Sequence, residues 1–371
     1  LGLEFFGRDY DSAREHFLRA LEIDSTFHTV LMYVAASYSN QGRWAKADSI
    51  YKILNRHRET MGDFDLLMLN WGMASVSGNY SRQIKILRQA ESVAPENKTI
   101  KYLIGLAGRD NNQPGLTVDT YRKFELEQLK GNIRGDWWLS VYIEALYMLG
   151  EYDKALDKVR LRKREFPDSP FNLVFEAELR AARGETEEVE RVVNESFQLS
   201  ESAPRPVLIY AAMALRKYGY LDEADKVCQR ALEWLRSRTD GDYRYSTARI
   251  LYLDGQWAEA GSLFEELHQE KPDDIEYLGY SGAAAARKGR VELARGVIDQ
   301  LYNRKESYMF GEHLHWCARI YSILGEKKRA VDMLREAHGR GYPYRMDELL
   351  IIDFEPLKDY QPYIELMQPK G

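Results

Sequence analysis

Apolar residues recur along the chain at positions i, i+3, i+4 and i+7, the spacing that places them on one face of an α-helix. Stripes of this kind come in twos, one before and one after a recurring glycine. Those before a glycine include Leu31/Val34/Ala35/Tyr38, Leu139/Tyr142/Ile143/Leu146, Leu208/Ala211/Ala212/Leu215 and Leu314/Cys317/Ala318/Tyr321, and Ala224/Cys228/Ala231/Leu232 is one that follows. The pattern predicts helix pairs, each joined by a short turn.

The glycines set a period near 34 residues. They are spaced by 34 to 36 residues, apart from one gap of 72 that spans two periods, and are Gly42, Gly78, Gly150, Gly184, Gly219, Gly255, Gly289 and Gly325. Five residues later there is usually an alanine: Ala47, Ala155, Ala224, Ala260, Ala294 or Ala330. Such a glycine ends the first helix in a backbone conformation that other residues resist, and the alanine lets the second helix approach closely. One pair cannot bury its own apolar faces, so neighbouring pairs must stack.

This pattern resembles the tetratricopeptide repeat family. The resemblance implies an all-α fold, a right-handed superhelical solenoid of about ten antiparallel helix pairs. The first unit is incomplete, and the others begin near residues 28, 64, 98, 136, 170, 205, 241, 275 and 311. We expect the solenoid to span residues 1–341, with an irregular unit near 98–135 where the turn Asn111–Gly115 is too long. Residues 342–371 break the period and are expected to cap the last apolar face.

A narrower resemblance involves the two ends of the chain. Arg8–Ala13 looks like the opening unit of helical-repeat regions in bacterial signalling proteins, and Asp353–Tyr363 looks like their closing segment, without the proline expected before Phe354. Those regions follow a winged-helix, nucleotide-cyclase or Ser/Thr kinase domain. The chain begins at Leu1 rather than Met, which suggests a piece of a longer protein.

The resemblance also implies where a partner binds, because the first helices of the units line the concave surface in this family. The stripe beside the core stripe then forms a peptide groove. Its residues are Tyr33, Met68, Tyr102, Trp137, Glu144, Tyr147, Phe175, Tyr210, Tyr245, Arg249, Tyr252, Tyr280, His315, Trp316 and Arg319, with Glu178 in the same register. Tyr, Trp and Arg are enriched in binding hot spots. The alternative interpretation is that these aromatic residues build the solenoid itself.

Two hypotheses about function follow. The first is a protein- or peptide-binding scaffold or sensing module of a larger bacterial signalling or regulatory protein, without catalysis of its own. The alternative is the regulatory C-terminal region of a kinase, cyclase or winged-helix regulator whose other domain lies upstream of Leu1. An RNA-binding array is disfavoured by the net charge of −6, because nucleic-acid binders need a basic face. We expect no membrane span, no cofactor and no bound metal, and solenoid ends that can self-associate.

Several clusters resemble chemical sites and are interpreted structurally. His313, His315 and Cys317 cannot all share a helix face, so we expect a core cysteine beside surface histidines. Gly279–Gly282 lies in a predicted helix and not at a strand-to-helix turn, so its glycines indicate close helix contact. The basic run Lys158–Arg164 complements the end of a helix dipole, and the acidic run Glu185–Glu190 complements the start of the next second helix.

The expected close contact at Ala260 gives a test of the predicted stacking. Ala260→Trp should lower the free energy of unfolding by roughly 1–3 kcal/mol or more, because a large side chain overpacks the helix crossing. Chemical denaturation of the variant beside the wild type measures this difference. A change within about 0.5 kcal/mol would contradict the contact.

Overall fold

A computed structural model of the chain describes residues 1–7, 9–123 and 134–370. Within these ranges every regular element is a helix, which confirms the predicted all-α class. Ten helix pairs follow one another: α1 (Gly2–Phe5) and α2 (Tyr10–Ile23), α3 (His28–Asn40) and α4 (Trp44–Arg56), α5 (Asp63–Val76) and α6 (Tyr80–Val93), α7 (Lys98–Asp110) and α8 (Pro114–Tyr121), α9 (Arg134–Met148) and α10 (Tyr152–Glu165), α11 (Phe171–Ala182) and α12 (Thr186–Leu199), α13 (Pro204–Lys217) and α14 (Leu221–Arg236), α15 (Arg244–Leu253) and α16 (Trp257–Glu270), α17 (Ile275–Arg287) and α18 (Val291–Tyr302), α19 (Glu312–Ile323) and α20 (Lys327–Gly339).

The turn between the helices of a pair needs one residue with a positive φ angle. The eight glycines that set the sequence period occupy this place, with φ between +68° and +85°. In the fourth pair, where the sequence has no glycine at this turn position, Asn112 takes the same conformation at φ +57°. Asparagine is one of the few residues that tolerate the left-handed region. The long gap between glycines therefore contains a turn of the same kind.

The fourth pair differs from the others in its second helix. Its second helix, α8, is much shorter than the other second helices and begins at Pro114, a residue suited to the first position of a helix. The buried ring of Tyr121 packs against Gly105 of α7. Its hydroxyl donates a hydrogen bond to the carbonyl oxygen of Tyr102, at 2.7 Å. The remainder of the unit, residues 124–133, lies outside the described residues.

Close contact between small and large residues joins neighbouring pairs. The six alanines that follow the turn glycines are fully buried. At Gly279 of α17, an added Cβ atom would lie only 2.1 Å from the indole ring of Trp316 on α19. The glycines of the Gly279–Gly282 run thus serve helix packing, as the sequence indicates. These contacts let adjacent pairs approach to a distance that a larger residue would forbid.

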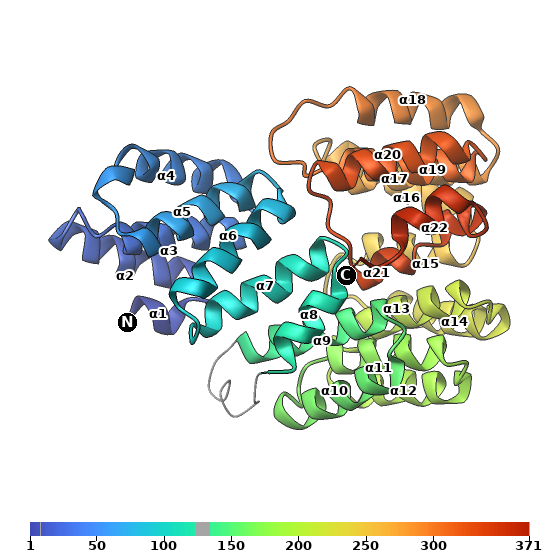
Figure 1. The fold of residues 1–371 in the computed structure, drawn as a ribbon. Helices are drawn as coiled ribbons and strands as arrows, with labels where there is room; N and C mark the ends of the chain where they lie inside the picture. The colour runs from blue at the N-terminus through green and yellow to red at the C-terminus, as the bar shows by residue number, and fades with distance from the viewer. Residues whose placement is uncertain (8, 124–133, 371) are drawn as a thin grey trace.

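The first helices of the pairs form one layer of the solenoid. Helix α3 packs against α5, α11 against α13, and α17 against α19. The chain curves strongly, so that the N-terminal helices and the last helices come to lie near each other around a central region (Figure 1). The C-terminal segment contacts the first helices α9, α13 and α19.

The two ends of the solenoid touch. In the loop before α19, the hydroxyl of Tyr308 donates to Asp48 of α4 at 2.7 Å, and Phe310 packs edge-on against Trp44 with 4.8 Å between ring centroids. Both loop residues have positive φ angles, +66° and +47°. This conformation is costly for a bulky side chain, so the contact with α4 must help to hold it.

Residues 342–371, which we call the tail, return to the inner side of the curve. They contain α21 (Met346–Leu349), the 3-10 helix η3 (Ile352–Leu357) and α22 (Gln361–Met367). Phe354, Leu357 and Tyr363 cover the apolar face of α19 and α20. Helix α21 reaches α9, and η3 reaches α13. The tail then ends beside the fourth pair, where the backbone nitrogen of Lys370 donates to the carbonyl oxygen of Asn112 at 2.7 Å.

Asp353 anchors the tail. Its buried carboxylate accepts hydrogen bonds from Tyr252 at 2.6 Å, Arg287 at 2.9 Å and Arg319 at 2.9 Å, on three successive first helices. Burial alone would raise the pKa of Asp353, but the guanidinium groups of Arg319 and Arg287 hold it below its usual value. The hydroxyl of Ser322 also donates to its backbone oxygen, at 2.6 Å.

Asp353→Asn should lower the free energy of unfolding by about 3 kcal/mol, because it leaves the buried guanidinium of Arg319 and the half-buried one of Arg287 without a negative charge. Urea denaturation of the full chain measures the loss. Asp359→Asn is the matched control, since Asp359 is exposed in the same tail, and should change stability by less than about 0.5 kcal/mol. Equal effects from the two variants would contradict the anchoring role.

Candidate functional site

The predicted groove residues fall into four groups in the structure. Trp137 is exposed, with 64% of its surface accessible. Tyr33, Met68 and Tyr102, on the N-terminal first helices, are half-buried. Glu144, Tyr147, Phe175 and Tyr210 lie on α9, α11 and α13. Tyr245, Arg249, Tyr252, Tyr280, His315, Trp316 and Arg319 lie on α15, α17 and α19.

The N-terminal members of the predicted groove pack within the solenoid. The ring of Tyr33 lies against Phe6 and Phe17, with 5.5 Å between centroids in both cases. Met68 packs against the core cluster around Leu87 and Ile104. Tyr102 is stacked parallel to Tyr121 at 6.5 Å. These contacts hold the three side chains within the solenoid, and Trp71 is also half-buried there.

The tail covers the members at the C-terminal end. Tyr252 and Arg319 bind Asp353, and the ring of His315 stacks on Tyr342 with 4.1 Å between centroids. The guanidinium of Arg319 also lies 3.6 Å from the centre of the Trp316 ring. The inner surface of α17 and α19 is therefore occupied by this chain's own residues. The sequence indicated a closing segment, but it did not indicate which residues of the first helices that segment contacts.

A second tail contact is formed by two histidines and a glutamate. The Oε1 atom of Glu348 lies 3.2 Å from Nε2 of His338 and 3.6 Å from Nε2 of His315, and all three side chains are buried. Burial opposes the charge of Glu348, but the histidines lower its pKa to about 2. Burial likewise opposes the charge of His338, yet Glu348 raises its pKa, whereas burial lowers the pKa of His315.

The expectation of surface histidines around Cys317 is wrong. His313 and His315 are buried, at 2% and 1% exposure, because the tail and the turn after α20 cover that face of α19. Burial raises the pKa of Cys317, and of Cys228, to about 12. Thiols of this kind stay protonated near neutral pH and make poor nucleophiles. Among the described residues, no group of three His, Cys, Asp or Glu side chains is arranged to hold a metal ion.

Tyr210, Tyr245 and Arg249 form a half-buried cluster that the tail's Asp353 does not reach. The guanidinium of Arg249 lies 5.7 Å from the centre of each tyrosine ring. Its Nη2 atom donates to the sulfur of Met213 at 3.4 Å, and within the described residues no carboxylate lies within 4.0 Å of it. The hydroxyl of Tyr245 donates to Glu276 at 2.6 Å. An arginine stacked on two rings keeps its charge available to a partner.

Glu144, Tyr147 and Glu178 occupy the middle of the inner surface. Glu144 forms an ion pair with Arg109 at 2.8 Å. The hydroxyl of Tyr147 shares a hydrogen bond of 2.5 Å with that of Tyr218. Both tyrosines line a pocket of about 580 Å³, together with Tyr152, Lys217 and the tail residues Leu349 and Tyr363. Glu178, at 3% exposure, lies near these tyrosines.

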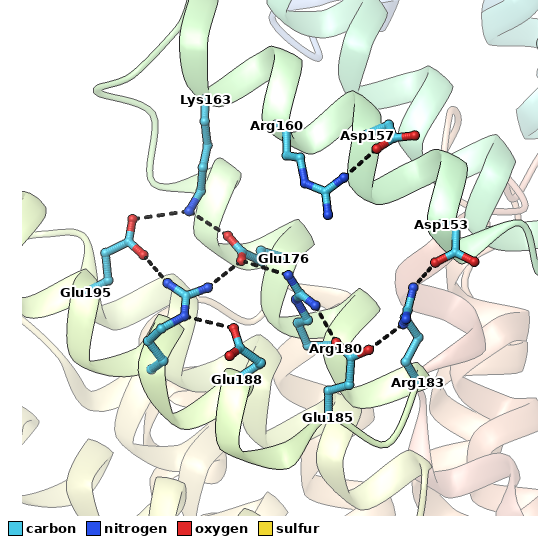
Figure 2. A network of polar contacts seen from close by, with 11 residues as sticks. Asp153, Asp157, Arg160, Lys163, Glu176, Arg180, Arg183, Glu185, Glu188 and Glu195 are labelled. Carbon is cyan, nitrogen blue, oxygen red and sulfur yellow. Dashed lines mark hydrogen bonds and ion pairs between the residues drawn. The ribbon is translucent and has the colours of Figure 1, made fainter.

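Lys163 of the basic run and Glu185 and Glu188 of the acidic run belong to one ion-pair network on α10, α11 and α12 (Figure 2). Lys163 binds Glu176 at 2.5 Å and Glu195 at 3.1 Å, and Arg191 binds Glu176 at 2.6 Å. Arg180 and Arg183 both bind Glu185. The network joins neighbouring helix pairs, because Lys163 of α10 binds carboxylates of α11 and α12.

Taken together, the stacked helix pairs and their glycine turns define an all-α helical-repeat solenoid that resembles the tetratricopeptide repeat architecture, as the sequence predicts. No protein-family model matches the chain. No curated protein matches it either. Within the described residues, no helix combines the length and apolar character needed to cross a membrane.

Solved structures of helical-repeat proteins resemble the chain. A tetratricopeptide repeat protein from Parabacteroides merdae is 16% identical, with 79% of this chain and 98% of that one covered and a TM-score of 0.38. Yeast Tom70 is 12% identical over 90% of this chain and 86% of its own, with a TM-score of 0.39. Human IFIT1, in its dimer with m7Gppp-AAAA, is 14% identical over 87% and 79%, with a TM-score of 0.38. Likeness at this level concerns the fold alone.

The contact between His338 and Glu348 predicts a pH dependence. Its contribution to stability is complete between the ordinary pKa of Glu, 4.5, and that of His, 6.5. It is lost as pH rises through the raised pKa of His338, and also as pH falls through the lowered pKa of Glu348. The free energy of unfolding of the wild type should therefore exceed that of His338→Gln by on the order of 1–3 kcal/mol in that pH window. At pH 9 the difference should be smaller.

Urea denaturation of both proteins between pH 3 and pH 9 checks this prediction. His315, whose pKa burial lowers, is present in both proteins. A stability difference that does not change with pH would contradict the charged contact.

Proposed function

We propose that the chain is a protein- or peptide-binding module that acts without catalysis. The single observation that carries this proposal is the cluster of Tyr210, Tyr245 and Arg249, which remains half-exposed on the first helices although Asp353 binds the neighbouring arginines. Aromatic rings with a stacked arginine are the side chains that dominate binding energy in protein interfaces.

The proposed binding surface runs over the inner side of α9 to α15. It begins at exposed Trp137 and passes Glu144 and Tyr210 to Tyr245 and Arg249. A curved layer of rigid helices offers such a surface in a preformed state, which lowers the conformational cost of binding. The support for peptide binding lies in these side chains and not in the similar solved structures.

The wider context is part of the proposal. The resemblance of both ends to helical-repeat regions of bacterial signalling proteins supports a sensing or scaffolding role within a larger polypeptide. The alternative proposal, a regulatory region that controls an attached kinase, cyclase or DNA-binding domain, rests on the same resemblance. The reading frame upstream of the codon for Leu1 distinguishes these two.

Capture of partners from the source organism's lysate tests the binding surface. The triple variant Trp137→Ala, Tyr245→Ala, Arg249→Ala should lose partners that the wild type retains, because each change removes a large contact or a charge. The matched control is Phe197→Ala, Tyr302→Ala, Arg236→Ala, which removes the same kinds of side chain from second helices at exposed positions.

The control should retain the partners, and circular dichroism should show equal helix content in all three proteins. Equal capture by the wild type and the triple variant would refute the proposed surface. Binding should then be sought on the outer face or in the polypeptide upstream of Leu1.

A further inference from the structure

Arg249 is a cation without an ion pair among the described residues. It lies on α15 and is half-buried. Its Nη2 atom donates to the sulfur of Met213 at 3.4 Å, and a thioether is a weak acceptor. Glu276, on α17, accepts a hydrogen bond from Tyr245 at 2.6 Å and forms no ion pair with this guanidinium. Because arginine does not lose its proton in a protein, the positive charge persists.

Two tyrosine rings hold this arginine in place. Its guanidinium carbon lies 5.7 Å from the ring centre of Tyr245, on the same helix, and 5.7 Å from that of Tyr210, on α13. Tyr245 is fixed in turn, because its hydroxyl binds Glu276 and its ring packs against Tyr277, with 5.6 Å between centroids. An arginine that is already ordered by aromatic rings loses less conformational freedom when it binds a partner.

The same arrangement occurs two helix pairs further along the chain, at Arg319. Arg249 and Arg319 each lie six residues before the turn glycine of their pair, so they occupy the same position in the repeat. The guanidinium of Arg319 lies 3.6 Å from the ring centre of Trp316, on its own helix α19, and 4.9 Å from that of Tyr280, on α17. Each arginine therefore meets one ring of its own helix and one ring of the first helix before it.

The tail shows what this arrangement binds. Oδ2 of Asp353 lies 2.9 Å from Nε and 2.8 Å from Nη2 of Arg319. Asp353 is an internal residue of the tail, so a side chain, and not a chain terminus, supplies the carboxylate. The next residue, Phe354, is buried, and its ring packs against His315 of α19. One of two equivalent arginines thus holds an aspartate that an aromatic residue follows, whereas the other holds no carboxylate among the described residues.

The two sites differ in how many donors they offer. Asp353 also accepts hydrogen bonds from Tyr252 at 2.6 Å and from Arg287 at 2.9 Å, and it is fully buried. Arg249 and the two tyrosine rings beside it remain half-exposed. A carboxylate at Arg249 therefore meets one guanidinium at a partly hydrated site, where an ion pair contributes less than in the interior. We expect a weaker, reversible contact, which suits a partner rather than a permanent part of the fold.

We propose that Arg249, with the rings of Tyr210 and Tyr245, binds the side-chain carboxylate of an aspartate in a partner protein, where an aromatic residue follows that aspartate. The inference rests on the proposed function and deepens it, because it names the chemistry that one position of the binding surface recognises. The N–H groups of a guanidinium match a carboxylate in both charge and geometry. The partner's aromatic ring can pack against the two half-exposed tyrosine rings.

Peptide selection measures this preference directly. Two pools of eleven-residue peptides, acetylated and amidated so that neither terminus is charged, are offered to the immobilised full chain. One pool has a central aspartate before a mixture of Phe, Tyr and Trp, and the other has asparagine in place of the aspartate. Mass spectrometry of the bound peptides gives the enrichment. The wild type should prefer the aspartate pool by about tenfold, the scale of a charge-assisted hydrogen bond at a half-exposed site.

Three variants assign the preference to one residue. Arg249→Gln removes the charge and should abolish the preference. Arg249→Lys keeps the charge but not the planar guanidinium, so the preference should fall to about threefold. The matched control is Arg236→Gln, which changes an exposed arginine on α14 and should keep the wild-type preference. Circular dichroism verifies that each variant is folded, and the result for Arg249→Lys decides the test where Arg249→Gln does not fold.

The outcomes distinguish this inference from the proposed function. Equal binding of both pools overturns the carboxylate site and leaves peptide binding intact. Binding of neither pool overturns peptide binding and the carboxylate site together. An unchanged preference in a folded Arg249 variant also overturns the assignment, because it places the aspartate elsewhere on the solenoid. A short single-stranded RNA is offered in the same way. RNA binding that Arg249→Gln abolishes, without a preference for aspartate, would assign the arginine to a phosphate instead.

Discussion

The structure depends on one constraint: a helix pair has two apolar faces, and it cannot bury both by itself. Each pair must therefore lie against the next at the distance that the side chains at the crossing permit. Fully buried Ala260 and the contact of Gly279 with the Trp316 ring keep that distance short. Because this spacing fixes the curvature, it also decides which side chains of successive first helices share the inner surface.

The same constraint explains the tail. The last pair, α19 and α20, has no successor, so its apolar face must be covered by another part of the chain. Phe354, Leu357 and Tyr363 cover it. Since these residues lie within a short segment, Asp353 is carried with them to the inner side, where Arg287 and Arg319 neutralise it. The same segment therefore caps the last helix pair and fills the C-terminal end of the groove.

The sequence was informative where the physics is local and repeated. Turn glycines and buried alanines recur with a fixed period, so the helix pairs and their stacking could be predicted. The turn at Asn112 was not recognised from the spacing of the glycines. The turn requires the left-handed backbone conformation, which asparagine can also adopt. The burial of His313 and His315 was missed because the covering residues lie in the tail, and a helical pattern carries no record of distant contacts. The contact of Tyr308 with Asp48 was hidden for the same reason.

The difference between the two halves of the inner surface has a physical meaning. An apolar side chain at Glu178 would serve helix packing at least as well, and a buried carboxyl without a partner costs free energy. Stacking does not require that cost, because Leu208 and Ala211 of the neighbouring α13 are buried apolar side chains. Places where a local rule is broken without internal compensation are where function is expected. Arg319 meets its counter-charge inside the chain, whereas Glu178 is buried without an ion pair among the described residues.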